Sequence, residues 1–179
     1  MSPSLQSRVV RLDNSRYHGP HRELDDVSLI VMHGTAGESA MSSVEWLDRP
    51  DSKHRASYHY IIDRDGTIYR HTAPSLIAYH AGDSCWPNPT KYPPGNRGLS
   101  VNSISLGIAF ANREDGEEIT DLQDESGLWL CRYWMDRLDI RPSRVVGHKD
   151  VSPGRKLDPR SLSLSEWRQK LVQYQPWAP

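Results

Sequence analysis

The sequence predicts a single-domain α/β protein in which helices pack on the faces of a central mixed β-sheet. Short apolar runs typical of buried strands alternate with segments of helical periodicity, and a hairpin lies between them. The length of 179 residues suits one hydrophobic core. We expect residues 1–26 to be a polar, irregular extension packed on a domain formed by residues 27–179.

Five short segments are predicted to build the sheet. Val27–Met32 and Ile104–Phe110 are rich in aliphatic residues, as buried strands are, and Arg144–Val146 is a shorter run of the same kind. Residues 57–62 and 67–71 flank an Asp-Gly pair that supplies the positive φ of a tight turn. These two segments are therefore predicted to form a β-hairpin.

Three helices are predicted from reciprocal capping boxes, in which two side chains three residues apart accept from each other's backbone N–H groups. The pairs are Ser42 with Glu45, Thr120 with Gln123, and Ser163 with Glu166. The middle helix is the longest, and we expect Pro142 to stop it. Its predicted apolar face consists of Leu122, Trp129, Leu130, Tyr133, Trp134 and Leu138. The Pro- and Gly-rich stretch from Gly82 to Asn102 is predicted to be a long loop beside a binding site.

Charge and composition exclude several classes of protein. The formal net charge is -1 and no basic run is present, so nothing in the sequence favours nucleic acid or an anionic membrane as a partner. No apolar stretch approaches the roughly 20 residues that cross a bilayer. The polar start predicts synthesis in the cytoplasm without a signal peptide. Cys85 and Cys131 are far apart and are expected to be unpaired thiols.

Eight histidines beside two cysteines favour a metal site of imidazole and carboxylate groups. His148 follows a short strand, a Pro-Gly turn comes next, and Asp158 returns ten residues later. His33 leaves the end of another strand. Two imidazoles and one carboxylate leave a fourth tetrahedral position for water, which is the arrangement of catalytic zinc.

The sequence resembles the zinc-dependent N-acetylmuramoyl-L-alanine amidases, which share a fold with phage lysozyme-type amidases and animal peptidoglycan recognition proteins. The resemblance runs from about Val27 to Pro159, roughly three quarters of the chain. Five motifs carry it, in the same order as in the family: His33-Gly-Thr-Ala36, Ser57-Tyr-His59, Tyr79-His-Ala-Gly82, Asn102–Ile108 and Gly147–Pro159.

The resemblance implies one Zn²⁺ per chain, held by His33, His148 and Asp158. It also implies that Lys156 donates to the oxyanion and that Tyr58 orients the attacking water. His80, Thr35 and Asn102 are expected to contact the substrate. The implied partner is bacterial peptidoglycan, in which the amide between the lactyl group and L-alanine would be cleaved by a monomeric protein. A phage- or prophage-type endolysin that acts on the cell wall is the favoured setting.

One departure from the family bears on the mechanism. The cytosolic recycling branch has a catalytic Glu where this chain has Ala109, so Tyr58 and Lys156 are expected to carry the protons, with an acid from elsewhere in the chain as the alternative. Three alternative interpretations remain: a recycling amidase, a peptidoglycan-binding module without turnover, and a zinc peptidase for another amide.

The residues outside the motifs have plainer interpretations. His59 is expected in the core, and the remaining histidines at the surface or in structural roles. Most tryptophans are expected in the core, with sugar stacking as the alternative. Arg155 is interpreted equally as a wall contact or an exposed charge.

Overall fold

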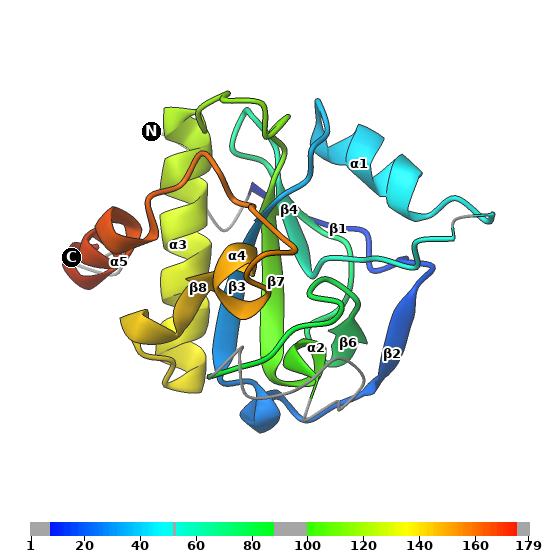
Figure 1. The fold of residues 1–179 in the computed structure, drawn as a ribbon, viewed down its shortest axis with the longest axis horizontal. Coiled ribbons are helices and arrows are strands. Elements are labelled where there is room, and N and C mark those ends of the chain that lie inside the picture. The colour runs from blue at the N-terminus through cyan, green and yellow to red at the C-terminus, as the bar shows by residue number, and fades with distance from the viewer. Residues whose placement is uncertain (1–7, 52, 88–99, 175–179) are drawn as a thin grey trace.

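The computed structural model describes residues 8–51, 53–87 and 100–174. It is an α/β fold with a six-stranded mixed sheet and flanking helices, as predicted (Figure 1). The strands are β1 (Val9–Arg11), β2 (His18–His21), β3 (Leu29–Gly34), β4 (Tyr60–Ile62), β5 (Ile68–Arg70), β6 (Leu76–Ala78), β7 (Ser105–Phe110) and β8 (Val145–Gly147). The helices are α1 (Ala40–Leu47), α2 (Val101–Ile104), α3 (Asp121–Leu138), α4 (His148–Val151) and α5 (Leu164–Gln173), with short 3₁₀ turns at Leu24–Asp26 and Pro142–Arg144.

The central sheet has the strand order β1-β5-β4-β7-β3-β8. β3 pairs in parallel with both β7 and β8, and β4 pairs in parallel with β7. The predicted hairpin is present, because β4 and β5 pair antiparallel around Gly66, whose φ is 80°. The parallel core of the sheet brings the carboxyl ends of β3 and β8 to one edge, where the site lies.

The two faces of the sheet bury different sets of side chains. Ile30 and Met32 of β3 join Phe110 in the main core, which packs against α3 and α5 on one side of the sheet (Figure 1). Leu29 and Val31 point the other way, into a smaller cluster with Val146 and Ala81. Since side chains alternate along a strand, His33 falls on this second face.

Several local predictions need correction. The α1 cap is Ser39, which forms its box with Ser42, so the predicted pair of Ser42 and Glu45 is wrong. Thr120 and Gln123 form the predicted box of α3. Ser163 is the N-cap of α5, but its side chain makes no capping bond. The α3 helix ends at Leu138, with Asp139 in the left-handed conformation, before Pro142 is reached.

The apolar face of α3 also differs from the prediction. Trp129, Leu130 and Trp134 are buried as predicted, whereas Leu122 in the first turn is 43% exposed. Cys131 and Met135 complete the buried stripe. In the first turn Gln123 is buried in place of Leu122, so the buried face of α3 starts one residue later than predicted.

The segment before Val27 is more regular than predicted. β1 is an edge strand of the central sheet, paired with β5, and β2 pairs antiparallel with β6 in a second sheet. Residues 100–104 of the predicted loop include the short helix α2. Residues 1–7, 88–99 and 175–179 lie outside the described part of the chain, and with them the expected polar start and most of the predicted loop.

Both cysteines are free, as predicted. Within the described ranges no helix combines the length and the apolar character that a membrane crossing needs.

Candidate metal centre and cleft

Three predicted ligands converge at the sheet edge. His33 ends β3 and His148 follows β8, and these strands are neighbours with Met32 opposite Gly147. The Nδ1 atoms of His33 and His148 each lie 3.1 Å from Oδ2 of Asp158. The two imidazole centroids are 4.6 Å apart. One ligand atom from each residue falls within 4.8 Å of the others, a spacing that can hold one metal ion.

The hydrogen bonds behind the ligands fix where the protons lie. The Ser105 hydroxyl donates to the carbonyl of Val101, so it must accept at 3.1 Å from Nε2–H of His80. Nδ1 of His80 then accepts at 3.0 Å from Nε2–H of His33. This series of hydrogen bonds leaves Nδ1 of His33 without a proton.

His148 is oriented in the same way by a different partner. Its Nε2–H donates at 3.0 Å to the carbonyl of Ala81. Its Nδ1 is therefore a bare acceptor as well. Three acceptor atoms with no proton between them repel one another unless a cation lies among them, so the arrangement fits a metal ion.

A backbone segment supports both imidazoles. Oδ1 of Asn102 accepts from the N–H groups of His80 and Ala81 at 3.2 and 2.8 Å. Asn102 is nearly buried and lies under the cleft, away from the residues that line it. His80 is also buried, with its ring against Gly107, where a Cβ would collide with it. The contacts of both side chains are with the chain itself.

The electrostatics of the ligands favour the unprotonated forms. Burial lowers the pKa of His33 to about 4, although the nearby Asp158 carboxylate opposes this shift. Burial alone would raise the pKa of the Asp158 carboxyl, but the neighbouring His148 and His33 rings outweigh it and hold that pKa well below its ordinary range. Near neutral pH the site therefore offers a neutral His33 imidazole and an ionised Asp158 carboxylate.

The ligands open into a cleft of about 1100 Å³. Tyr58, Thr35 and Lys156 line it, and His80 reaches its wall. The ring of Tyr58 lies 5.1 Å from that of His33. Burial raises the pKa of the Tyr58 phenol well above its ordinary value, helped by the charges of Asp158 and Glu114. Tyr58 thus stays protonated and can act as a donor.

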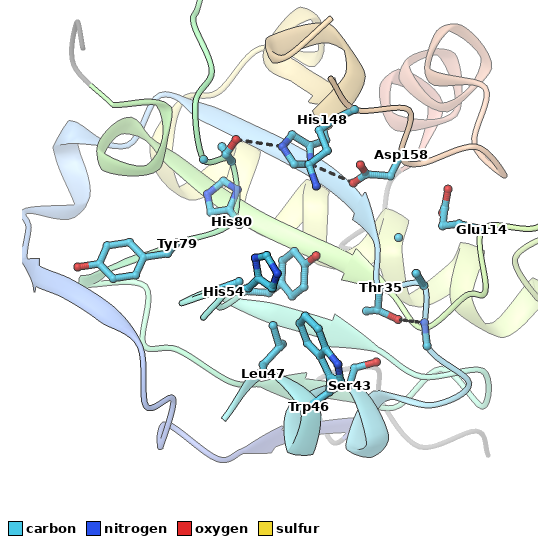
Figure 2. A pocket seen from close by; sticks show the side chains of 18 of the residues that line it. Thr35, Ser43, Trp46, Leu47, His54, Tyr79, His80, Glu114, His148 and Asp158 are labelled. Carbon is cyan, nitrogen blue, oxygen red and sulfur yellow. Dashed lines mark hydrogen bonds and ion pairs between the residues drawn. The ribbon is translucent and has the colours of Figure 1, made fainter. Parts of the chain in front are cut away.

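The cleft also contains residues that the sequence did not single out. Trp46 of α1 is 46% exposed and lies across the cleft from His148, and His54 lines the same side (Figure 2). Glu114, in the loop after β7, lines the cleft near Asp158. In the sequence, the only signal for Trp46 was a tryptophan in a short segment. Such a residue can bind a ligand or lie in the core, and the sequence alone does not separate these roles. Trp129, Trp134 and Trp167 are in the core.

Arg155 braces the loop between the second and third ligands. Its guanidinium donates to the carbonyls of Ala81 and Asp83 and to the hydroxyl of Ser152. The side chain therefore ties the segment that supports His148 to the turn that carries Asp158.

A buried arginine underlies the whole site. Arg22, from the segment before β3, donates at 2.8 to 3.2 Å to the carbonyls of Pro74, Asn102, Ser103 and Ser105. Burial lowers the pKa of its guanidinium to about 10, so it remains a cation at neutral pH. His59, fully buried as predicted, lies beside it and accepts from the N–H of Gly107. Arg22 links the N-terminal segment to the residues that carry Asn102 and Ser105.

Fold and site together define the class, an α/β protein with three side chains placed so that they could hold one metal ion at a cleft. The chain belongs to the N-acetylmuramoyl-L-alanine amidase family, whose model matches residues 23–161. The resemblance seen in the sequence is thereby confirmed.

Three known proteins illustrate the similarity. The N-acetylmuramoyl-L-alanine amidase AmiD of Escherichia coli is 25% identical over 151 residues, which cover 76% of this chain and 50% of AmiD. The chain thus spans about half the length of that relative. A crystal structure of AmpD superposes with a TM-score of 0.75 at 21% identity, over 91% of this chain and 94% of AmpD, and shows the shared fold. The endolysin amidase LysCS of Clostridium intestinale gives a TM-score of 0.66 at 26% identity, over 92% of this chain and 95% of LysCS.

Proposed function

We propose that this chain is a zinc-dependent N-acetylmuramoyl-L-alanine amidase that hydrolyses the amide between the lactyl group of N-acetylmuramic acid and L-alanine in peptidoglycan. The observation that carries the proposal is the convergence of three unprotonated acceptor atoms at the floor of a large cleft, in a chain of the amidase family. Zinc held there would supply hydroxide at neutral pH and polarise the scissile carbonyl.

The residues around the metal position each have a distinct task in this proposal. His33, His148 and Asp158 hold the ion. Lys156 lines the cleft two residues before Asp158 and donates to the carbonyl oxygen as negative charge develops on it. Tyr58, kept protonated by burial, donates a hydrogen bond to the reacting groups.

The three predicted substrate residues divide into two groups. Thr35 lines the cleft and its Oγ1 accepts from the N–H of Gly37 at 3.0 Å, which leaves its hydroxyl hydrogen for a substrate acceptor. We propose that Thr35 contacts substrate. For His80 and Asn102 we propose a positioning role, because their hydrogen-bonding atoms are occupied by His33, Ser105 and backbone N–H groups.

For the biological setting we propose a phage- or prophage-type endolysin that degrades the cell wall. Support comes from Ala109, which stands where the recycling branch carries its Glu, and from the similarity to the endolysin LysCS. A cytosolic amidase that recycles soluble wall fragments is the alternative, supported by the similarity in fold to AmpD.

The experiment that separates the two settings compares intact sacculi with a soluble anhydro-muropeptide as substrates. New L-alanine amino termini from both substrates, without new reducing sugar ends, are expected of an endolysin. Cleavage of the soluble fragment alone would leave the amidase proposal standing and overturn the endolysin setting.

Tyr58→Phe tests the donor role. We expect turnover to fall by about 10- to 100-fold, within the range of a positioned proton donor, while the zinc content stays unchanged. Turnover within a factor of two of the unmodified chain would remove Tyr58 from the mechanism.

A further inference from the structure

The cleft contains one carboxylate that the ligand set does not use. Among the described residues that line it, only Asp158 and Glu114 are acidic. Asp158 is committed to the metal position. Glu114 belongs to the loop that follows β7, and its negative charge contributes to the electrostatic environment of Tyr58.

The chain holds the Glu114 carboxylate in place by three separate features. Its Oε2 accepts from the backbone N–H of Arg160 at 2.7 Å. Its backbone is left-handed, with φ of 61°, and its N–H donates at 2.7 Å to Oδ1 of Asn112. Its Oε1 rests against Gly34, where the Cβ of any other residue would collide with the carboxylate. A left-handed glutamate is uncommon, and such strain persists where the surrounding structure enforces it.

The second carboxylate oxygen has no partner. Oε1 of Glu114 is inaccessible to solvent and accepts no hydrogen bond from the described part of the chain. Buried polar atoms are nearly always satisfied, and exceptions call for an explanation such as a catalytic role or an ordered water. Burial and the charge of Asp158 also raise the pKa of this carboxyl, although the bond from Arg160 opposes them.

Hydrolysis needs an acceptor for the proton of the attacking water. Tyr58 stays protonated, and a lysine ammonium such as that of Lys156 has no lone pair to accept with. Glu114 is the remaining acidic side chain among the described lining residues.

We propose, on the basis of the amidase function above, that Glu114 is the general base of the reaction. As the water oxygen bonds to the amide carbon, a water proton passes to the carboxylate of Glu114. When the C–N bond breaks, the same proton passes to the nitrogen of the departing L-alanine. The sum is hydrolysis of one amide by one water, with Glu114 returned to its starting state.

The competing explanation is that Glu114 only braces the segment after Asp158 through Arg160. Glu114→Gln separates the two roles, because the amide oxygen still accepts from the N–H of Arg160 but the side chain takes no proton. Glu114→Ala removes both. Glu118→Gln, an exposed position in the same loop, is the matched control.

We measure kcat and KM on a soluble muropeptide, zinc per chain, Tm, and the affinity of the metal-free protein for uncleaved substrate. For Glu114→Gln we expect kcat to fall at least about 100-fold, as for loss of a general base, with the other quantities unchanged. Glu118→Gln should match the unmodified chain.

Two results would overturn the proposal. One is turnover of Glu114→Gln within threefold of the unmodified chain, whether or not Glu114→Ala is impaired. The other is a loss of activity in Glu114→Gln that is accompanied by loss of zinc or a lowered Tm, which is the signature of bracing alone. Inactivity of the unmodified, zinc-loaded chain would instead refute the amidase function itself.

Discussion

The floor and the rim of the cleft are built in opposite ways. The floor, which we define as His33, His80, Asn102, Ser105 and His148, is buried, and its side chains are hydrogen-bonded to one another or to backbone. The rim, which we define as Trp46, His54 and Leu157, is exposed. Under the proposed function, the floor would govern metal binding and the stability of the site, whereas the rim would contribute contact surface for substrate. Changes in the two regions should therefore affect different measurements.

The largest effect is expected beneath the floor. Arg22→Ala would leave four backbone carbonyls without their donor and should lower the free energy of unfolding by about 3–5 kcal/mol. Urea denaturation gives the value, with Arg137→Ala as an exposed control. A loss below about 1 kcal/mol would mean that Arg22 is not a structural cation of the floor.

His80→Ala removes the residue that fixes the tautomer of His33. Loss of such a supporting partner typically weakens metal binding about 10- to 100-fold, and we expect zinc affinity to fall by that amount. Competition with a chelator measures it, and His21→Ala at an exposed position serves as the control. Unchanged zinc affinity would contradict the proposed role of the hydrogen bonds from Ser105 through His80 to His33.

Buried histidines at and beneath the floor make the folded chain sensitive to acid. Burial and the charge of Arg22 hold the pKa of His59 well below 6.5, so below pH 6.5 the unfolded chain binds a proton that the folded chain does not. The free energy of unfolding should therefore fall as pH decreases, by up to about 1.4 kcal/mol per pH unit for each such histidine.

Urea denaturation of the metal-free protein at pH 7.5 and 5.5 tests this prediction. His59→Gln should show a weaker pH dependence, because one of the buried histidines is gone. Equal stability at the two pH values would show that the buried imidazoles do not behave as described.

The smallest effect is expected at the rim. Trp46→Ala removes an exposed aromatic surface and should raise KM for glycan-containing substrate by about 3- to 10-fold, equivalent to roughly 1 kcal/mol of binding. Stability should change by less than about 0.5 kcal/mol. Met41→Ala, equally exposed on α1 but outside the cleft lining, is the control. A large loss of zinc in Trp46→Ala would erase the distinction between rim and floor.

The sequence predicted that His33, His148 and Asp158 come together but not what surrounds them, and the reason is physical. His33 and His148 follow short apolar strands, and neighbouring parallel strands end at one edge of a sheet. Their convergence therefore follows from local patterns. Arg22 instead contacts residues that lie 52 to 83 positions away in the sequence. Glu114 contacts Arg160, which lies 46 positions away. No local pattern encodes such contacts.

The rim was missed for a different reason. Whether Trp46 faces the cleft or the core depends on the rotation of α1 about its axis. The predicted cap at Ser42 differs from the observed cap at Ser39, so the start of the helix moves by almost one turn. Similarly, Leu122 lies in the polar first turn of α3, where helical periodicity alone does not give burial.

The most direct test of the account is to measure zinc per chain together with the products formed from purified sacculi, for the unmodified chain and for Asp158→Ala. We expect one zinc per unmodified chain and new L-alanine amino termini without new reducing sugar ends. Both zinc and products should be lost in the variant. A zinc-loaded, unmodified chain that binds sacculi but releases no L-alanine termini would contradict the account and identify a recognition module.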